Sequence, residues 1–132
     1  MTARKQVVSP PAAGLDAGRE PHQQRSTAVR GGAFVFVSGL TAVDPETGAP
    51  MPGTTQSETR QILANLKQIL EAAGSSMDKV VKVTVLLRSM LEMPNMAGEY
   101  AEFFPEPPPA RTVCGARLPD GVKVIIEATA LA

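Results

Sequence analysis

The chain contains very little of what disulfides, metal sites and nucleic-acid surfaces are built from. Its 132 residues include one cysteine, Cys114, and one histidine, His22. An intrachain disulfide is therefore impossible, and a zinc site would lack most of its usual Cys and His ligands. The formal net charge is zero and no run of Lys or Arg supplies a basic surface. This argues against a protein that binds the phosphate backbone of nucleic acids. We expect no metal and no cofactor.

Long apolar runs and aromatic residues are also scarce. No apolar stretch is long enough to cross a bilayer, and the first 15 residues lack the apolar core of a signal peptide. Only 4% of the residues are aromatic, which leaves little for a base-stacking platform. We predict a cytoplasmic protein with no membrane and no nucleic-acid partner. The length predicts one domain, 1–132, in which 1–25 form a loosely ordered arm or a short strand plus loop.

The first half of the chain shows a hairpin pattern and then a helix pattern. Residues 26–29 and 33–38 predict a hairpin around Gly31-Gly32, with its second strand buried on both faces. Apolar residues then recur at helical spacing over 56–73. A capping box between Thr55 and Glu58 is expected to begin this helix, and Gly74 is expected to end it.

The second half predicts a strand over 80–88 and a short helix over 95–104. Two further strands, 110–118 and 122–130, are expected to pair as a hairpin around Pro119-Asp120-Gly121. This order predicts an α+β fold, a mixed β-sheet with two helices packed on one face. The other face of the sheet, which would carry Val80, Lys82, Thr84 and Leu86, is expected to be covered by further copies of the chain.

Arg111 and Glu127 are the residues that best suit chemistry. In the expected hairpin Glu127 lies opposite Val113, so Arg111 and Glu127 are diagonal neighbours with Cβ atoms roughly 7–8 Å apart. An arginine fork binds a carboxylate through two hydrogen bonds. A glutamate within the apolar run 122–130 is expected to be partly desolvated, which suits proton transfer. A simple cross-strand ion pair between the two residues is the alternative.

Several segments resemble the RidA/YjgF family. They include Phe36-Val-Ser-Gly39, Pro109-Ala-Arg-Thr112, Arg117-Leu-Pro119 and Val124-Ile-Ile-Glu127, and the resemblance extends over about 26–130. It implies a chorismate-mutase-like fold, a homotrimer with clefts between subunits, and hydrolysis of reactive enamines and imines.

The resemblance also implies roles for individual residues. Arg111 corresponds to the carboxylate-binding arginine and Glu127 to the glutamate that positions water. Ser38 and Gly39 correspond to the Ser-Gly pair at the cleft, and Val113 stands where many members have cysteine and would act through its backbone. Cys114 is expected to be a small buried side chain.

The chain departs from the family pattern at the rim of the cleft. The tyrosine of the first strand is replaced by Arg25, or by His22 if the segment is shifted. The asparagine of the second helix is replaced by Ala97, which precedes Tyr100. These departures leave the range of substrates open.

Two functions follow as hypotheses. The first is hydrolytic deamination of 2-imino and 2-enamino acids to 2-oxo acids and ammonia. The second is a non-catalytic trimer that binds small carboxylates or regulates a partner. A ribonuclease activity is disfavoured by the neutral charge and the single histidine.

Overall fold

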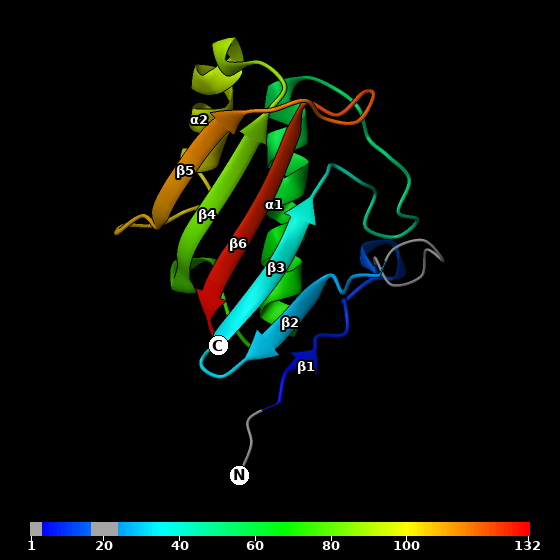
Figure 1. Ribbon diagram of the computed structural model, residues 1–132, viewed down its shortest axis with the longest axis vertical. Coiled ribbons are helices and arrows are strands. Elements are labelled where there is room, and N and C mark those ends of the chain that lie inside the picture. The colour runs from blue at the N-terminus through cyan, green and yellow to red at the C-terminus, as the bar shows by residue number, and fades with distance from the viewer. Residues whose placement is uncertain (1–3, 17–23) are drawn as a thin grey trace.

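The computed structural model describes residues 4–16 and 24–132, and Figure 1 shows one sheet with helices behind it. The strands are β1 (Gln6–Val7), β2 (Ala28–Gly31), β3 (Phe34–Leu40), β4 (Val80–Leu87), β5 (Ala110–Gly115) and β6 (Val124–Leu131). The helices are α1 (Thr55–Ala72) and α2 (Met93–Ala101), with short 3-10 turns η1 (Ala13–Leu15), η3 (Met77–Lys79) and η4 (Met90–Glu92). No helix within these described ranges is long and apolar enough to span a membrane.

A mixed sheet with the strand order β1-β2-β3-β6-β4-β5 carries both helices on one face, which confirms the predicted α+β fold. β6 is antiparallel to β3 and β4, whereas β5 is parallel to β4. α1 connects β3 to β4 and α2 connects β4 to β5, so each helix is a crossover above the same face. The helices and the sheet share one core, whose fully buried side chains include Ile62, Leu66, Leu70, Val83, Val85 and Ile126.

The hairpin predicted for the last two strands is wrong. β5 and β6 are not neighbours, because β4 lies between them. The segment 116–123 crosses the end of β4, and the Arg88 guanidinium holds it there by donating to the carbonyls of Leu118, Pro119 and Val122. The turn residues at 119–121 indicate that the chain reverses. They carry no information about which strand lies beside each arm.

The long helix is confirmed to within one residue at each end, but its cap differs from the expected one. Thr54 is the N-cap: its Oγ1 accepts a hydrogen bond from the Ser57 N–H at 3.0 Å, and the Ser57 Oγ accepts one from the Thr54 N–H at 3.0 Å. Glu58 is therefore not part of the capping box and is 2% exposed within the core. Gly74 follows the helix at a φ of 81°, as expected for a glycine in this place.

The first predicted hairpin is confirmed, with β2 antiparallel to β3 and Gly32 at a φ of 57° in its turn. Its second strand is not buried on both faces, however. Phe34 and Phe36 are 39% and 48% exposed, because the alternation of β3 turns them away from the helices while Val35 is fully buried.

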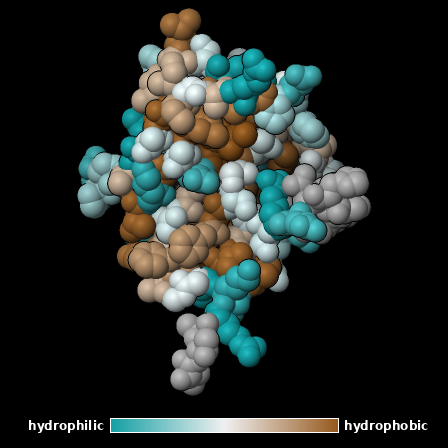
Figure 2. Space-filling model, viewed as in Figure 1, coloured by the Kyte–Doolittle hydropathy of each residue, from teal (hydrophilic) through white to brown (hydrophobic). Residues whose placement is uncertain are grey.

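The sheet face opposite the helices remains open in the described chain. Lys82, Thr84 and Leu86 lie on it as predicted, but a bulge in β4 moves Val80 to the core face, beside Ala130. Figure 2 shows this open face, where apolar atoms gather over the end that carries the β2–β3 turn. The exposed apolar side chains there include Phe34, Phe36 and Leu131.

The described part of the N-terminal segment packs against this domain. β1 pairs with β2, and Val8 and Leu15 are each 6% exposed. Gly14 touches the turn at 44–48, where a Cβ on Gly14 would lie 2.4 Å from the Gly48 backbone nitrogen. A glycine is therefore required for η1 to lie this close to the turn.

Candidate functional site

A bulge in β3 brings three of the predicted site residues together. Val37 pairs with Ala128 and Leu40 with Ile126, so Ser38 and Gly39 together stand opposite Glu127. Ser38 is held by two hydrogen bonds, from its N–H to the Thr27 carbonyl at 2.9 Å and from its Oγ to the Ser26 carbonyl at 2.6 Å. A Cβ on Gly39 would lie 3.0 Å from the Ile125 Cγ2, so a larger residue would press against the Ile125 side chain.

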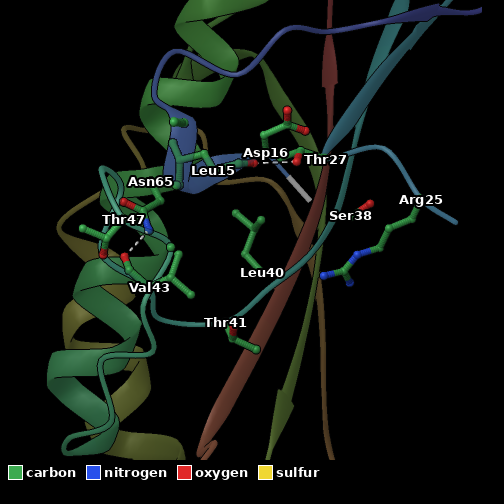
Figure 3. A pocket seen from close by; sticks show the side chains of 14 residues that line it. Leu15, Asp16, Arg25, Thr27, Ser38, Leu40, Thr41, Val43, Thr47 and Asn65 are labelled. Atoms are coloured by element: carbon green, nitrogen blue, oxygen red, sulfur yellow. Dashed lines mark hydrogen bonds between the residues drawn. The ribbon is translucent and has the colours of Figure 1, made fainter. Parts of the chain in front are cut away.

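A cavity of about 330 Å³ lies beside this bulge (Figure 3). Its walls are β3, the loop that follows it, α1 and η1. The Thr27 Oγ1 donates to the Leu15 carbonyl at 2.6 Å, which fixes η1 as one wall. The buried Asn65 donates from Nδ2 to the Val43 carbonyl at 2.9 Å, which fixes the loop. η1, α1 and the continuous segment formed by β3 and its following loop thus form a preorganised cavity next to Ser38 and Gly39.

Arg111 lies at a different place, on the edge strand β5. It pairs with Val83, whose side chain is buried under the helices, so Arg111 points to the helix side of the sheet. Its Cζ lies 4.8 Å from the centre of the Tyr100 ring in α2, within range of a cation–π interaction. Burial raises the pKa of Tyr100, while the charge of Arg111 opposes the rise, so the ring stays neutral beneath the guanidinium. Tyr100 was not identified as a partner from the sequence, because the contact joins a helix and a strand.

A second cavity, of about 440 Å³, lies beside this arginine. Ala97 and Tyr100 of α2 line it together with Pro108 and Pro109, which precede β5. Val113 is half buried on the same side of β5 as Arg111, next to Val85. The surroundings of Arg111 are therefore those of an exposed cation held over an aromatic ring at the rim of a cavity.

The prediction that Arg111 and Glu127 are diagonal neighbours on one face of the sheet is wrong. Glu127 pairs with Thr84 in β4, whereas Arg111 pairs with Val83 on the opposite side of that strand. The two side chains point to opposite faces of the sheet and are two strands apart, which is about 9–10 Å across the sheet alone. Glu127 is also exposed in the single chain rather than desolvated, because it lies on the open face. Within one chain the candidate site is divided into two halves.

Cys114, Arg25 and His22 are the other residues for which the sequence predicted a location. Cys114 is exposed, so its predicted burial is wrong: it pairs with Leu86 and faces the open side of the sheet. Arg25 lines the cavity beside Ser38, whereas His22 lies outside the described residues. Among the described residues no group of three or more His, Cys, Asp and Glu side chains is placed to hold a metal ion.

The comparisons with known proteins agree with this architecture. The endoribonuclease L-PSP family model matches residues 18–132. A RutC family protein of Pyrococcus horikoshii is 45% identical over 106 residues, which cover 80% of this chain and 84% of that protein. The 2-iminobutanoate/2-iminopropanoate deaminase of Mus musculus is 39% identical over 107 residues, which cover 80% of this chain and 79% of the deaminase. The crystal structure of RidA from a Psychrobacter species superimposes with a TM-score of 0.83 at 30% identity, covering 96% of this chain and 99% of that one.

The sheet order, the helices on one face and the bulged central strand beside a cavity define a class of small α+β proteins. This chain belongs to the RidA/YjgF family, whose members include the matched L-PSP, RutC and RidA proteins.

Proposed function

We propose that this protein hydrolyses 2-imino acids, and their 2-enamino tautomers, to 2-oxo acids and ammonia. The observation that carries the proposal is the exposure of Arg111 and its lack of hydrogen-bond partners among the described residues. Its guanidinium is exposed beside a cavity, lies over Tyr100, and forms no hydrogen bond or ion pair with any described residue. An arginine held by its face with its N–H groups unpaired suits the two oxygens of a carboxylate. The deaminase relative from Mus musculus supports the same chemistry.

The proposed reaction needs only water as a second reactant. Arg111 donates two hydrogen bonds to the substrate carboxylate, and Glu127 accepts a hydrogen bond from a water molecule. The water oxygen attacks the carbon of the C=N bond, whose π electrons move to the nitrogen as it takes up a proton. In the resulting carbinolamine the hydroxyl proton passes to the nitrogen, the C–N bond breaks, and ammonia leaves a 2-oxo acid. No electrons are gained or lost, so no redox cofactor is required.

The two halves of the site face different surfaces of one chain, so we propose that they meet between subunits of a homotrimer. The half with Ser38, Gly39 and Glu127 would face the Arg111 half of a neighbouring subunit. The open sheet face supports this arrangement, because the apolar surface around Phe36 favours burial at roughly 25 cal/mol per Å². Closed symmetry is the common outcome when one chain covers another copy of itself.

Imine hydrolysis is testable in a coupled assay. An amino-acid oxidase would generate 2-iminopropanoate or 2-iminobutanoate while semicarbazide traps the remaining imine. We expect the wild-type protein to suppress semicarbazone formation. We expect Glu127→Gln to lower kcat about 100-fold, because a neutral amide accepts a hydrogen bond from water more weakly than a carboxylate and cannot take up the proton of the attacking water. Glu71→Gln is the matched control, since Glu71 is an exposed residue of α1.

An absence of turnover with several imino acids would defeat the proposal. If 2-oxo acids nevertheless protected Arg111 from phenylglyoxal, the non-catalytic carboxylate-binding function would be favoured. RNA cleavage that persists through purification and is lost in the Glu127→Gln variant would favour a ribonuclease instead.

The assembly makes a separate prediction. Light scattering at micromolar concentration is expected to give about three times the chain mass of 13.9 kDa. Phe36→Glu places a charge on the open face and is expected to dissociate the assembly. Leu91→Glu is the control, because Leu91 is 88% exposed on η4, away from that face. A soluble wild-type monomer that still hydrolyses imines would contradict an intersubunit site.

A further inference from the structure

The polar side chains that line the cavity beside Ser38 are largely engaged already. Thr27 and Ser38 donate through their hydroxyls to backbone carbonyls, and Asn65 does so through its amide. Asp16, the acidic residue that lines the cavity, is also not without a partner. The hydroxyl and amide groups among these residues shape the cavity, but they carry no charge that could neutralise an anionic ligand.

Arg25 differs from these residues. Its side chain is exposed and lines the cavity, and it makes no hydrogen bond or ion pair with any residue of 4–16 or 24–132. Figure 3 shows it extending beside Ser38, with the guanidinium turned toward the middle of the site. A guanidinium offers five N–H donors and keeps its charge at any physiological pH. Arg25 is thus a permanent cation whose N–H groups have no hydrogen-bond partner within the described part of the chain.

The proposed site contains a second such arginine. The N–H groups of Arg111 likewise have no partner among the residues that the structure describes, and the proposed function assigns them to the carboxylate next to the imine carbon. A substrate with one carboxylate would leave Arg25 without a partner. A cavity of about 330 Å³ lies within the range of small-ligand sites, so there is room for a longer substrate.

We propose that Arg25 binds a second carboxylate, and that the preferred substrates are imines of dicarboxylic amino acids, namely 2-iminosuccinate and 2-iminoglutarate. This inference rests on the proposed function. The 1-carboxylate lies on Arg111 of one subunit, and the distal carboxylate lies on Arg25 of the subunit that supplies Ser38, Gly39 and Glu127. The products are the corresponding 2-oxo dicarboxylates and ammonia.

A matched pair of substrates tests this proposal. 2-Iminosuccinate and 2-iminobutanoate both have four carbons and differ only in a terminal carboxylate in place of a methyl group. We expect the wild-type protein to favour 2-iminosuccinate by about tenfold or more in kcat/KM, because a charge-assisted hydrogen bond discriminates to that extent. Arg25→Gln should lower this preference about tenfold, and Arg25→Lys should retain part of it because the charge remains.

Lys67→Gln is the control for loss of a positive charge, since Lys67 is exposed on α1 and does not line the cavity. It is expected to leave the preference unchanged. The proposal is overturned if 2-iminobutanoate is the better substrate, or if Arg25→Gln changes both kcat/KM values by the same factor.

Binding of unreactive ligands separates this proposal from the proposed function. Succinate is expected to bind the wild-type protein at least tenfold more tightly than butanoate by calorimetry, and Arg25→Gln should remove the difference. Hydrolysis of 2-iminobutanoate without any preference for succinate would refute the dicarboxylate inference alone. A failure of all imines to react, with the succinate preference intact, would refute the hydrolase function but leave Arg25 as an anion-binding residue.

Discussion

Arg111→Ala is expected to lower kcat/KM for 2-imino acids by about 100-fold or more while leaving the fold intact. The loss corresponds to two charge-assisted hydrogen bonds to the substrate carboxylate. The fold should tolerate the change because Arg111 is exposed and its one described contact is with the Tyr100 ring. Loss of that contact costs about 0.5–1 kcal/mol. Steady-state kinetics and a thermal melt of the same preparation would measure both effects.

Two variants give this experiment its controls. Arg111→Lys keeps the charge but not the fork, so its kcat/KM is expected to lie between those of wild type and Arg111→Ala. Arg117→Ala removes an exposed arginine outside the two cavities and is expected to retain wild-type kinetics. An Arg111→Ala protein with wild-type kcat/KM would show that the carboxylate is bound elsewhere.

Glu58→Ala is expected to destabilise the protein by about 3 kcal/mol. The Glu58 carboxylate accepts hydrogen bonds from the Gly53 N–H at 3.1 Å and the Lys123 N–H at 2.9 Å, and it lies 3.8 Å from the Lys123 Nζ. Alanine would leave both backbone donors unpaired and the ammonium without its counter-ion. Glu58 connects the start of α1 to the segment before β6, so its loss should loosen both.

Thermal or urea unfolding at a fixed protein concentration would measure this change, because oligomer stability depends on concentration. Glu99→Ala is the matched control. Glu99 also forms an ion pair, with Arg60 at 2.6 Å, but the arginine side chain is 57% exposed. An exposed pair contributes at most about 1 kcal/mol. Equal destabilisation by the two substitutions would show that burial of Glu58 does not matter.

The local elements were predictable because each depends on residues that are close in the sequence. The Gly31-Gly32 turn, the apolar period of α1 and the C-terminal Gly74 are determined within a few positions of where they act. The capping box was misplaced by one residue because threonines stand at both 54 and 55 and either can cap a helix. Only the hydrogen bonds of Thr54 and Ser57 distinguish the two.

The candidate site was predictable in its residues but not in its geometry. Arg111 and Glu127 were singled out by the chemistry of their side chains, and resemblance to a family added Ser38, Gly39 and Val113. The spacing of the last two strands predicted a hairpin, and the hairpin placed Arg111 beside Glu127. The hairpin and the proximity of Arg111 to Glu127 were wrong together, because the expected distance between the two residues depended on the pairing of their strands.

Chain length, charge, periodicity and turn chemistry of this protein are properties of the sequence alone, and they were sufficient for the α+β class and the long helix. Strand order, bulges and exposure are decided by contacts between distant residues. The insertion of β4 between β5 and β6 is stabilised by ladders on both sides and by Arg88 above its end. The bulge at Ser38-Gly39 sets what faces Glu127. Because a shift of one residue in pairing turns a side chain to the other face, only the tertiary structure could show that Arg111 and Glu127 point apart.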